Sequence, residues 1–363
     1  MFAPNFQISP ATATALMAIE ADRQMIMELP INVDVLAGLR ETARLIATHY
    51  STQIEGNRLT QAQVVEAIAG THFPGRERDE AEVRNYYRAL EHIEAAATES
   101  GPISEEMIRR IHGLVMHGKA KATPYRDGQN VIREASTGRV VYMPPEAADV
   151  PGLMAGMFDW LNEQLAARVL PAPLIAALIH YQYATIHPYY DGNGRTARLL
   201  TTLVLHRAGY GLKGIYSLDE HYARNLTNYY TALTVGPSHN YYLGRADADL
   251  TEFVDYFCTS MAAALGSVRA RATEVANTPT ARHADDAAVR RTLDPRQRRV
   301  LELFRASREV TTADIASHLA VSPRTASTLA RRWTETGFLM CENPSRRARS
   351  YRLSAEYERI VLP

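Results

Sequence analysis

Twelve consecutive residues combine a histidine, an aspartate, two glycines and two arginines at spacings that suit phosphate chemistry. The run extends from His187 to Arg198 and reads His-Pro-Tyr-Tyr-Asp-Gly-Asn-Gly-Arg-Thr-Ala-Arg. An imidazole beside a phosphate can act as a general base, and a carboxylate can hold Mg²⁺ between phosphate oxygens. The residue types therefore indicate phosphate-transfer chemistry, with His187 as the base and Asp191 as the Mg²⁺ ligand.

The backbone of the same run is suited to binding an anion. Pro188 disfavours helical geometry at His187, so the preceding helix should end there. The segment Gly192–Gly194 allows a turn through positive φ, whose N–H groups form an anion nest at the start of the next helix. Arg195 and Arg198 share one face of that helix. We expect a polyphosphate cradle with two guanidinium clamps; a glycine-rich turn with solvated arginines is the alternative.

This run resembles the signature of the Fic family, His-x-Phe-x-Asp-Gly-Asn-Gly-Arg-x-x-Arg, at every defining position except one. Tyr189 stands where the family has Phe, and its ring is expected in the core, where its hydroxyl needs a hydrogen-bond partner. Fic enzymes mostly transfer AMP from ATP to a protein hydroxyl and release pyrophosphate. The resemblance implies a helical Fic fold, ATP as substrate, Mg²⁺, and a target protein with an acceptor hydroxyl; the chain itself is one candidate for that target.

The resemblance also gives individual residues a role. His187 is similar to the base that deprotonates the target Ser, Thr or Tyr, and Asp191 to the Mg²⁺ ligand. The phosphate contacts fall to the anion nest and the two clamps, namely Gly192, Asn193, Gly194, Arg195 and Arg198. On the adenine side, Asn225 matches a residue that hydrogen-bonds the base, and Tyr229 or Tyr230 one that packs against it. Helix packing explains either tyrosine nearly as well.

A shorter pattern upstream resembles the inhibitory motif of the family, Ser/Thr-x-x-x-Glu-Gly/Asn. Ser51 and Glu55 match its fixed side chains, and Gly56 can end the helix that carries them. The resemblance implies that Glu55 pairs with Arg198. That pairing would neutralise the clamp, put negative charge at the γ-phosphate position and misalign the α-phosphate of bound ATP. The alternative is an ordinary helix end with a surface glutamate.

Two β-prone stretches, Gln129–Arg133 and Arg139–Met143, predict a hairpin inside a helical chain. The hairpin resembles the Fic flap, which aligns an extended target beside the active site, as in strand addition to a sheet edge. The candidate edge comprises Gln129, Asn130, Val131 and Ile132. An incidental surface hairpin is the alternative.

Apolar residues at helical spacing dominate the rest of the chain before residue 267, so the predicted fold class is mainly α. Ser104 is a predicted N-cap. The predicted helices are Ala11–Leu29, Val33–Thr48, Thr60–Ile68, Glu80–Ala97, Leu153–Leu170, Pro173–Ile186 and about 194–208. We expect four parts: an N-terminal helical region with the inhibitory helix (1–100), the Fic core (101–266), a helix tail and linker (267–294), and a winged helix-turn-helix domain (295–363).

The C-terminal part is strongly basic. Residues 290–352 hold 14 arginines, no lysine and six acidic residues, and the remainder of the chain is acidic, so the net charge is zero. Helical patterns near 295–306, 311–319 and 322–336 precede β-prone stretches at Phe338–Cys341 and Ser350–Leu353, as in a winged helix. Ser322 is expected to cap the last helix, with Pro323 at its first position.

The use of this domain stays open between two partners. Side chains early in the second helix of a helix-turn-helix usually contact bases; here they are Arg324, Thr325, Ser327 and Thr328. The wing would add Arg346, Arg347 and Arg349. DNA binding through residues 295–355 is one interpretation, and contact with a protein, including a homodimer partner, is the other.

The composition narrows the classes of protein to which this chain could belong. The 363 residues include two distant cysteines, no long apolar run and no obvious secretory signal, so we expect a soluble, cytoplasmic protein without disulfides or membrane contact. An inhibited protein adenylyltransferase is the leading hypothesis. A hydrolase that removes AMP at the same site, and a DNA-binding regulator whose Fic domain senses nucleotide, are the competing ones.

Overall fold

The computed structural model describes residues 2–31, 33–133, 137–236, 238–277, 293–343, 345, 349–358 and 361. The chain divides into two compact units, 1–276 and 277–363. The predicted mainly α fold class is confirmed, because helices dominate the first unit and strands are short. No helix in the described ranges has the length and apolarity to cross a membrane. Most of the predicted linker, together with Arg346 and Arg347, lies outside the described residues.

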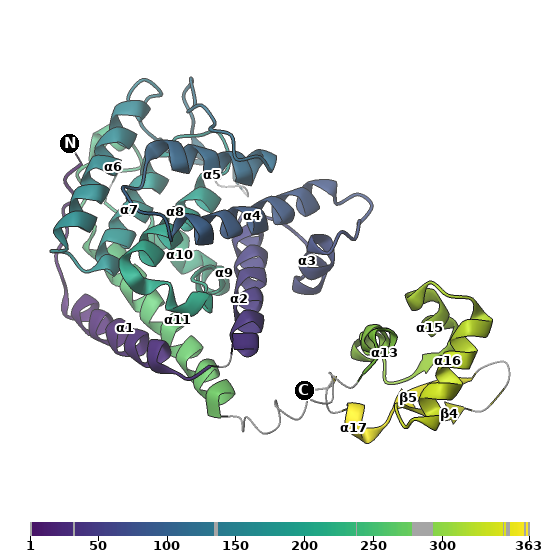
Figure 1. The fold of residues 1–363 in the computed structure, drawn as a ribbon. Coiled ribbons are helices and arrows are strands. Elements are labelled where there is room, and N and C mark those ends of the chain that lie inside the picture. Colours follow the sequence, from purple (N-terminus) through teal and green to yellow (C-terminus); the bar gives the residue numbers. More distant parts are fainter. Residues whose placement is uncertain are drawn as a thin grey trace. The chain divides into compact units, whose positions relative to one another are not determined.

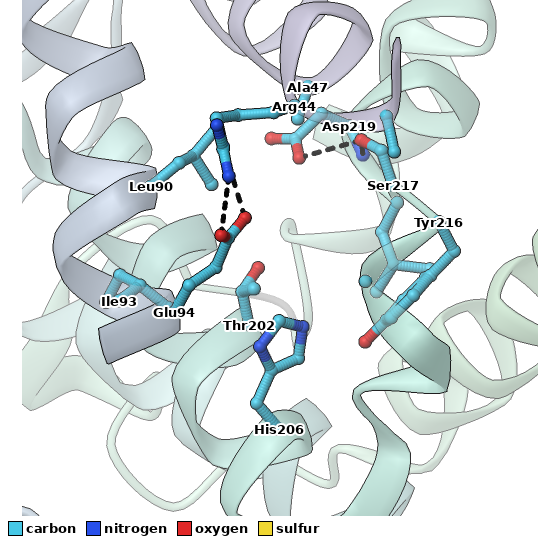
Figure 2. A pocket seen from close by; sticks show the side chains of 13 residues that line it. Arg44, Ala47, Leu90, Ile93, Glu94, Thr202, His206, Tyr216, Ser217 and Asp219 are labelled. Atoms are coloured by element: carbon cyan, nitrogen blue, oxygen red, sulfur yellow. Dashed lines mark hydrogen bonds and ion pairs between the residues drawn. The ribbon is translucent and has the colours of Figure 1, made fainter. Parts of the chain in front are cut away.

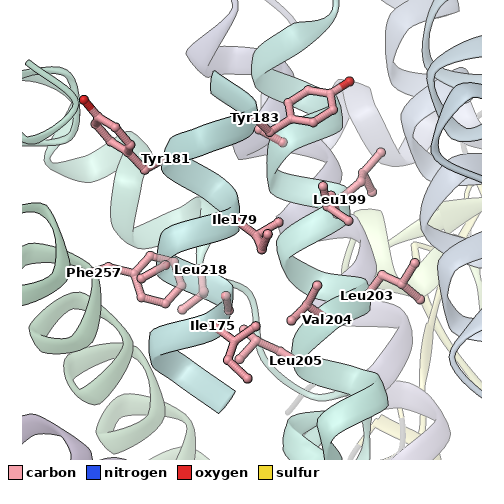
Figure 3. Close-up of a cluster of buried hydrophobic side chains, with 14 of the residues drawn as sticks. Ile175, Ile179, Tyr181, Tyr183, Leu199, Leu203, Val204, Leu205, Leu218 and Phe257 are labelled. Atoms are coloured by element: carbon pink, nitrogen blue, oxygen red, sulfur yellow. The ribbon is translucent and has the colours of Figure 1, made fainter. Parts of the chain in front are cut away.

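The core of the first unit is built on α7 (Ala172–Ile186) and α8 (Asn193–Leu205). Every residue of α7 from Pro173 to Tyr183 is buried, as expected for a helix that is apolar on all sides. Figure 3 shows Ile175 and Ile179 of α7 facing apolar side chains of α8. Because α7 and α8 are fixed in the core, the loop between them, residues 187–192, has rigid ends, and the rest of the run, Asn193–Arg198, begins α8.

Further helices pack around this pair or against the helices that cover it (Figure 1). They are α1 (Pro10–Glu28), α2 (Val33–Ile54), α3 (Gln61–Ile68), α4 (Glu77–Ala96), α5 (Glu105–His117), α6 (Val150–Ala167), α9 (Asp219–Arg224), α10 (Leu226–Ala232) and α11 (Thr251–Asn277). Ser104 caps α5 as predicted, since its side chain accepts a hydrogen bond from Met107 N. A π-helical turn, His206–Tyr210, follows α8.

The second helix is longer than its predicted range of Val33–Thr48. It continues to Ile54, and Gly56 follows at φ 93°. The prediction stopped too early because the polar segment after Thr48 lacks an apolar stripe, although Ser51 and Thr52 are buried. The extension puts Ser51 in the last turn of α2 and Glu55 directly after it.

The hairpin is present with shorter strands than predicted. β1 (Ile132–Arg133) and β2 (Val140–Tyr142) are antiparallel, with Ile132 opposite Tyr142. Gln129 and Asn130 lie outside the ladder because their side chains donate hydrogen bonds to Pro144 O at 3.0 Å and Tyr189 O at 3.3 Å. The predicted edge is therefore a strand only at Ile132, and an extended segment held by side chains before it.

The second unit has its own apolar core around Trp333 and Phe338. Its elements are α13 (Pro295–Val300), α14 (Leu303–Ala306), β3 (Val310–Thr311), α15 (Thr312–Leu319), α16 (Pro323–Glu335), β4 (Leu339–Asn343), β5 (Ser350–Leu353) and α17 (Ala355–Glu358). The sheet order is β3-β5-β4, all antiparallel. Ser322 caps α16 as predicted. The order of helices and strands is compatible with a winged helix, which stays a prediction.

Candidate active site

His187 lies at the end of α7 with its imidazole in the form a base requires. It adopts φ 52° and ψ 60°, a left-handed cap, where the following proline alone predicts extended backbone. Nδ1 is 3.3 Å from Ala184 O, so it carries the proton and leaves the Nε2 lone pair for a substrate. Burial lowers the pKa of His187 to about 4. The ring is therefore neutral near pH 7.

The loop after His187 is closed by the side chain of Asn193. Its Oδ1 accepts from Tyr189 N at 3.0 Å, and its Nδ2 donates to Tyr189 O at 2.8 Å. Gly192 has φ 78° and lies so close to α5 that a Cβ at this position would stand 2.6 Å from Met116 Sδ. The backbone of the predicted anion nest is thus fixed, whereas the Asn193 side chain faces the protein interior.

Asp191 and Arg195 form an ion pair on the exposed side of this loop. Arg195 Nη2 is 3.2 Å from Asp191 Oδ1, and the Asp191 side chain is 55% exposed while that of Arg195 is 3% exposed. Among the described residues no group of three His, Cys, Asp or Glu side chains converges on one point. Mg²⁺ bound with a nucleotide needs only one or two carboxylates plus phosphate oxygens, so Asp191 fits an ion that arrives with the nucleotide.

Arg198 is held by the end of α2. Its Nε donates to Ser51 Oγ at 2.8 Å, and its Nη2 to Ser51 O and Glu55 Oε1, each at 2.9 Å. The Glu55 carboxylate also lies over the start of α8, since a Cβ on Gly194 would stand 2.3 Å from its Oε1. Glu55 therefore occupies the position, at a helix N-terminus and an arginine, that suits a phosphate.

The structure corrects one residue on the predicted adenine side. Tyr229 is 3% exposed, and its hydroxyl lies 2.9 Å from His180 Nε2 while its ring stacks on Tyr222. It is a core residue. Tyr230 is 48% exposed and donates to Ile54 O at 3.3 Å, and Asn225 is exposed, so these two side chains remain accessible to a ligand.

Two residues that position the loop were missed from the sequence. His112 of α5 donates from Nε2 to Asp191 O at 2.9 Å, and its ring stacks on Tyr189 with centroids 3.5 Å apart. Burial lowers the pKa of His112 to about 4, so the ring is neutral. A single histidine on a helix gives no sequence signal for a partner 79 residues away.

The other missed residue is Arg126, which joins the hairpin to the loop. It is 3% exposed, its Nε donates to His187 O and its Nη1 to Gly128 O, each at 3.0 Å, and its Nη2 donates to Pro145 O. Its own amide donates to Pro188 O at 3.0 Å. No motif in the sequence singles out Arg126, which precedes the predicted hairpin.

Tyr189 lies in the core as expected, but its hydroxyl lacks the partner that the sequence analysis required. The Oη atom is buried without a hydrogen bond. The nearby Thr123 hydroxyl interacts instead with His112 Nδ1, at 2.7 Å, and with Arg109 O, at 3.2 Å. A phenylalanine would fill the same position without an unsatisfied polar atom.

Residues 102–205 of this chain, which include this loop and its surroundings, match the Fic/DOC family. The chain is 31% identical over 198 residues to the protein adenylyltransferase Fic of Drosophila willistoni; the matched region covers 54% of this chain and 38% of that protein. It is 33% identical over 176 residues to the protein adenylyltransferase fic-1 of Caenorhabditis briggsae, covering 47% and 33%. The chain thus spans well under half the length of these curated relatives.

Solved structures agree on the fold. A Fic family protein from Desulfovibrio desulfuricans covers 98% of this chain at 22% identity and a TM-score of 0.60. A Fic domain containing signaling protein from Bacteroides thetaiotaomicron covers 72% of this chain and 96% of its own, at 25% identity and a TM-score of 0.61. The helical architecture of the first unit is therefore that of Fic proteins.

Proposed function

We propose that this chain is a protein adenylyltransferase that Glu55 holds in an inactive state. The carrying observation is that Glu55 Oε1 contacts both Arg198, at 2.9 Å, and the backbone at the start of α8. In this position the carboxylate competes with the distal phosphates of ATP for the same donors. Curated relatives of about 30% identity are named protein adenylyltransferases, which supports the reaction class.

The proposed reaction uses the groups of the α7–α8 loop. His187 Nε2 removes the proton from a hydroxyl of the target protein, and the resulting oxygen attacks the α-phosphorus of ATP in line with the leaving group. A new P–O bond forms, the α–β bond breaks, and pyrophosphate leaves. The N–H groups at the start of α8 stabilise the phosphates, and Arg195 and Arg198 hold the distal ones.

Asp191 would hold Mg²⁺ in this scheme. When bound, the ion neutralises phosphate charge and fixes the oxygens of the triphosphate relative to one another. Asp191 is suited to this role because its carboxylate is half exposed, while one of its oxygens is fixed by Arg195 and by Gly192 N.

The hairpin supplies an edge for the target. The chain directly after β2 is already paired, since Met143 N donates to His239 O at 2.8 Å and Met143 O accepts from Tyr241 N at 3.0 Å. The opposite side, along Gln129 to Ile132, pairs with β2 only at Ile132. A target segment that adds to this side would run past the loop that carries His187, because Asn130 is bonded to Tyr189 O.

The chemistry of this proposal is tested with labelled ATP in the Glu55→Gly background. Label should enter a protein acceptor, or the chain itself, with Glu55→Gly and not with Glu55→Gly/His187→Ala. Mass spectrometry of the labelled protein would identify the transferred group as AMP or another nucleotide. Equal labelling by both proteins would eliminate His187 as the base.

Removal of AMP is a second candidate reaction, favoured by the proximity of Glu55 to His187. The Glu55 carboxylate acts to raise the pKa of His187, although burial, which lowers this pKa, has the larger effect. A carboxylate beside the base can orient a water for hydrolysis. AMP-modified protein should then lose AMP with the wild type and keep it with Glu55→Gly. No loss with either protein would leave transfer as the supported direction.

The second unit suits duplex DNA, which we propose as its partner over a protein. Arg324, Thr325, Ser327, Thr328 and Arg331 are exposed along α16, and the segment 290–352 has 14 basic against six acidic residues. Phosphate contacts by arginine make affinity fall steeply with salt. The full chain should bind duplex DNA at low salt, and Arg324→Ala should weaken binding; salt-independent or undetectable binding would favour a protein partner.

A further inference from the structure

Arg198 is in contact with a second carboxylate that no sequence motif singled out. Asp219 Oδ1 lies 3.2 Å from Arg198 Nε, and both side chains are buried. Ser217 Oγ donates to Asp219 Oδ2 at 3.1 Å and accepts from Asp219 N at 3.1 Å. The Tyr86 hydroxyl of α4 donates to Asp219 Oδ1 at 3.4 Å. The carboxylate is therefore fixed by α4 and by the turn before α9.

Three further contacts of the Arg198 guanidinium come from the end of α2. They are Ser51 Oγ, Ser51 O and Glu55 Oε1, and these three would shift together if the end of α2 moved to admit a phosphate. A buried guanidinium that loses its partners destabilises the fold, because its charge is left uncompensated. Its side chain also becomes free to change rotamer. Ser51 also interacts with Asp219, but the supports of Asp219 from Ser217 and Tyr86 are not part of α2.

Among the described residues of the pocket wall beside Asp219, no other carboxylate is available to take its place at Arg198. Figure 2 shows Asp219 at the wall of a pocket that also exposes Glu94, Thr202 and His206. Glu94 is committed to Arg44, at 2.7 Å. Asp219 is thus the carboxylate of this wall that reaches Arg198.

We propose that Asp219 is a positioning residue for Arg198, which keeps the guanidinium directed at the distal phosphates of a nucleoside triphosphate after Glu55 has withdrawn. Asp219 contacts Nε, whereas Arg198 Nη1 lies 3.2 Å from the point where a Cβ on Gly194 would stand, over the phosphate side of α8. The inference rests on the proposed function and assigns preference for triphosphates over monophosphates to this pair.

The test measures binding of ATP and AMP separately from transfer, in the Glu55→Gly background. Asp219→Asn keeps the shape and removes the charge; we expect ATP affinity to fall about tenfold, as for loss of one charge-assisted contact, and AMP affinity to stay within about twofold. In transfer assays KM for ATP should rise while kcat at saturating ATP changes little. Ser217→Ala, which loosens Asp219 without removing it, should give a smaller change of the same kind.

The control is Glu220→Gln, which removes the neighbouring carboxylate that pairs with Arg224 at 2.8 Å and should change neither affinity. Unchanged ATP affinity, or equal losses for ATP and AMP, would overturn the proposal. If Asp219→Asn does not fold by circular dichroism, the Ser217→Ala comparison decides. If Glu55→Gly transfers nothing yet ATP and AMP respond differently, the proposed function fails and the role of Asp219 stands.

Discussion

At the scale of single residues, the site is defined by which donors are already occupied. Arg198 and the start of α8 are both in contact with Glu55, and Arg195 is paired with Asp191. Under the proposed function, the positive groups that a triphosphate needs are thus assembled before it binds, and Glu55 takes the place of a phosphate at Arg198. The proposed inactive state would then result from competition rather than from missing parts.

The Tyr189 hydroxyl gives a prediction about stability. Because its buried oxygen lacks a hydrogen bond, Tyr189→Phe should leave the free energy of unfolding unchanged or raise it by about 1 kcal/mol. Urea unfolding of both proteins measures this. A loss of more than about 1 kcal/mol would show that the hydroxyl has a partner in solution.

The pKa of His187, the proposed base, determines the pH dependence that we expect for transfer. Burial lowers the pKa of His187 to about 4, so the reactive neutral form is retained as pH falls from 8 to about 5 and is lost only below that. Initial rates of AMP transfer by Glu55→Gly at saturating ATP should therefore stay nearly flat across this range. A steep loss between pH 7 and 6 would place the working pKa near that of free histidine.

At the scale of elements, the sequence predicted the helices better than the strands. Helices such as α7 follow from long apolar stretches, and caps such as Ser104 and Ser322 are local signals. The hairpin ladder is shorter than its β-prone stretches because Gln129 and Asn130 bond to other segments. Within the site, the motif and Glu55 were predictable, whereas His112, Arg126 and Asp219 act on partners distant in sequence.

Arg126 gives a prediction about how hairpin and loop work together. Arg126→Met, made in the Glu55→Gly background, removes hydrogen bonds to His187 O, Gly128 O and Pro145 O and keeps the apolar stem. Transfer to a protein target should fall at least about tenfold, as expected for lost alignment, while ATP affinity stays within about threefold. Arg133→Met, which removes a bond to Gly138 O within the hairpin, is the control.

A fall in ATP affinity equal to the fall in transfer would contradict this division of labour. It would mean that Arg126 supports the anion nest and not the alignment of hairpin and base.

At the scale of the whole molecule, neutral histidines are buried in the first unit. Burial lowers the pKa of His180 to about 3 and that of His112 to about 4. The unfolded chain, with histidine pKa values near 6.5, binds more protons below that pH, so stability is lost as pH falls from 6.5 toward 4. The unfolding free energy should decrease by about 0.7 kcal/mol per such histidine from pH 7 to 6 and by about 1.2 kcal/mol from pH 6 to 5; a flat profile would contradict their burial.

The two units also divide the charge of the chain. The basic residues of 290–352 offset an acidic remainder, so zero net charge conceals two differently charged surfaces. Under the proposed function, Arg195, Arg198 and a bound Mg²⁺ would meet the charge of a triphosphate locally, so the first unit would need no overall positive charge to bind it. Any duplex binding is therefore expected from the second unit.

The contact between Glu55 and Arg198 carries the central claim, and one comparison tests it. Wild type and Glu55→Gly are incubated with labelled ATP, Mg²⁺ and cell extract, and AMP on protein is quantified. The account predicts weak labelling by wild type and an increase of at least about tenfold with Glu55→Gly, because the variant frees Arg198 and the start of α8 for the distal phosphates. Equal labelling by the two proteins would contradict it.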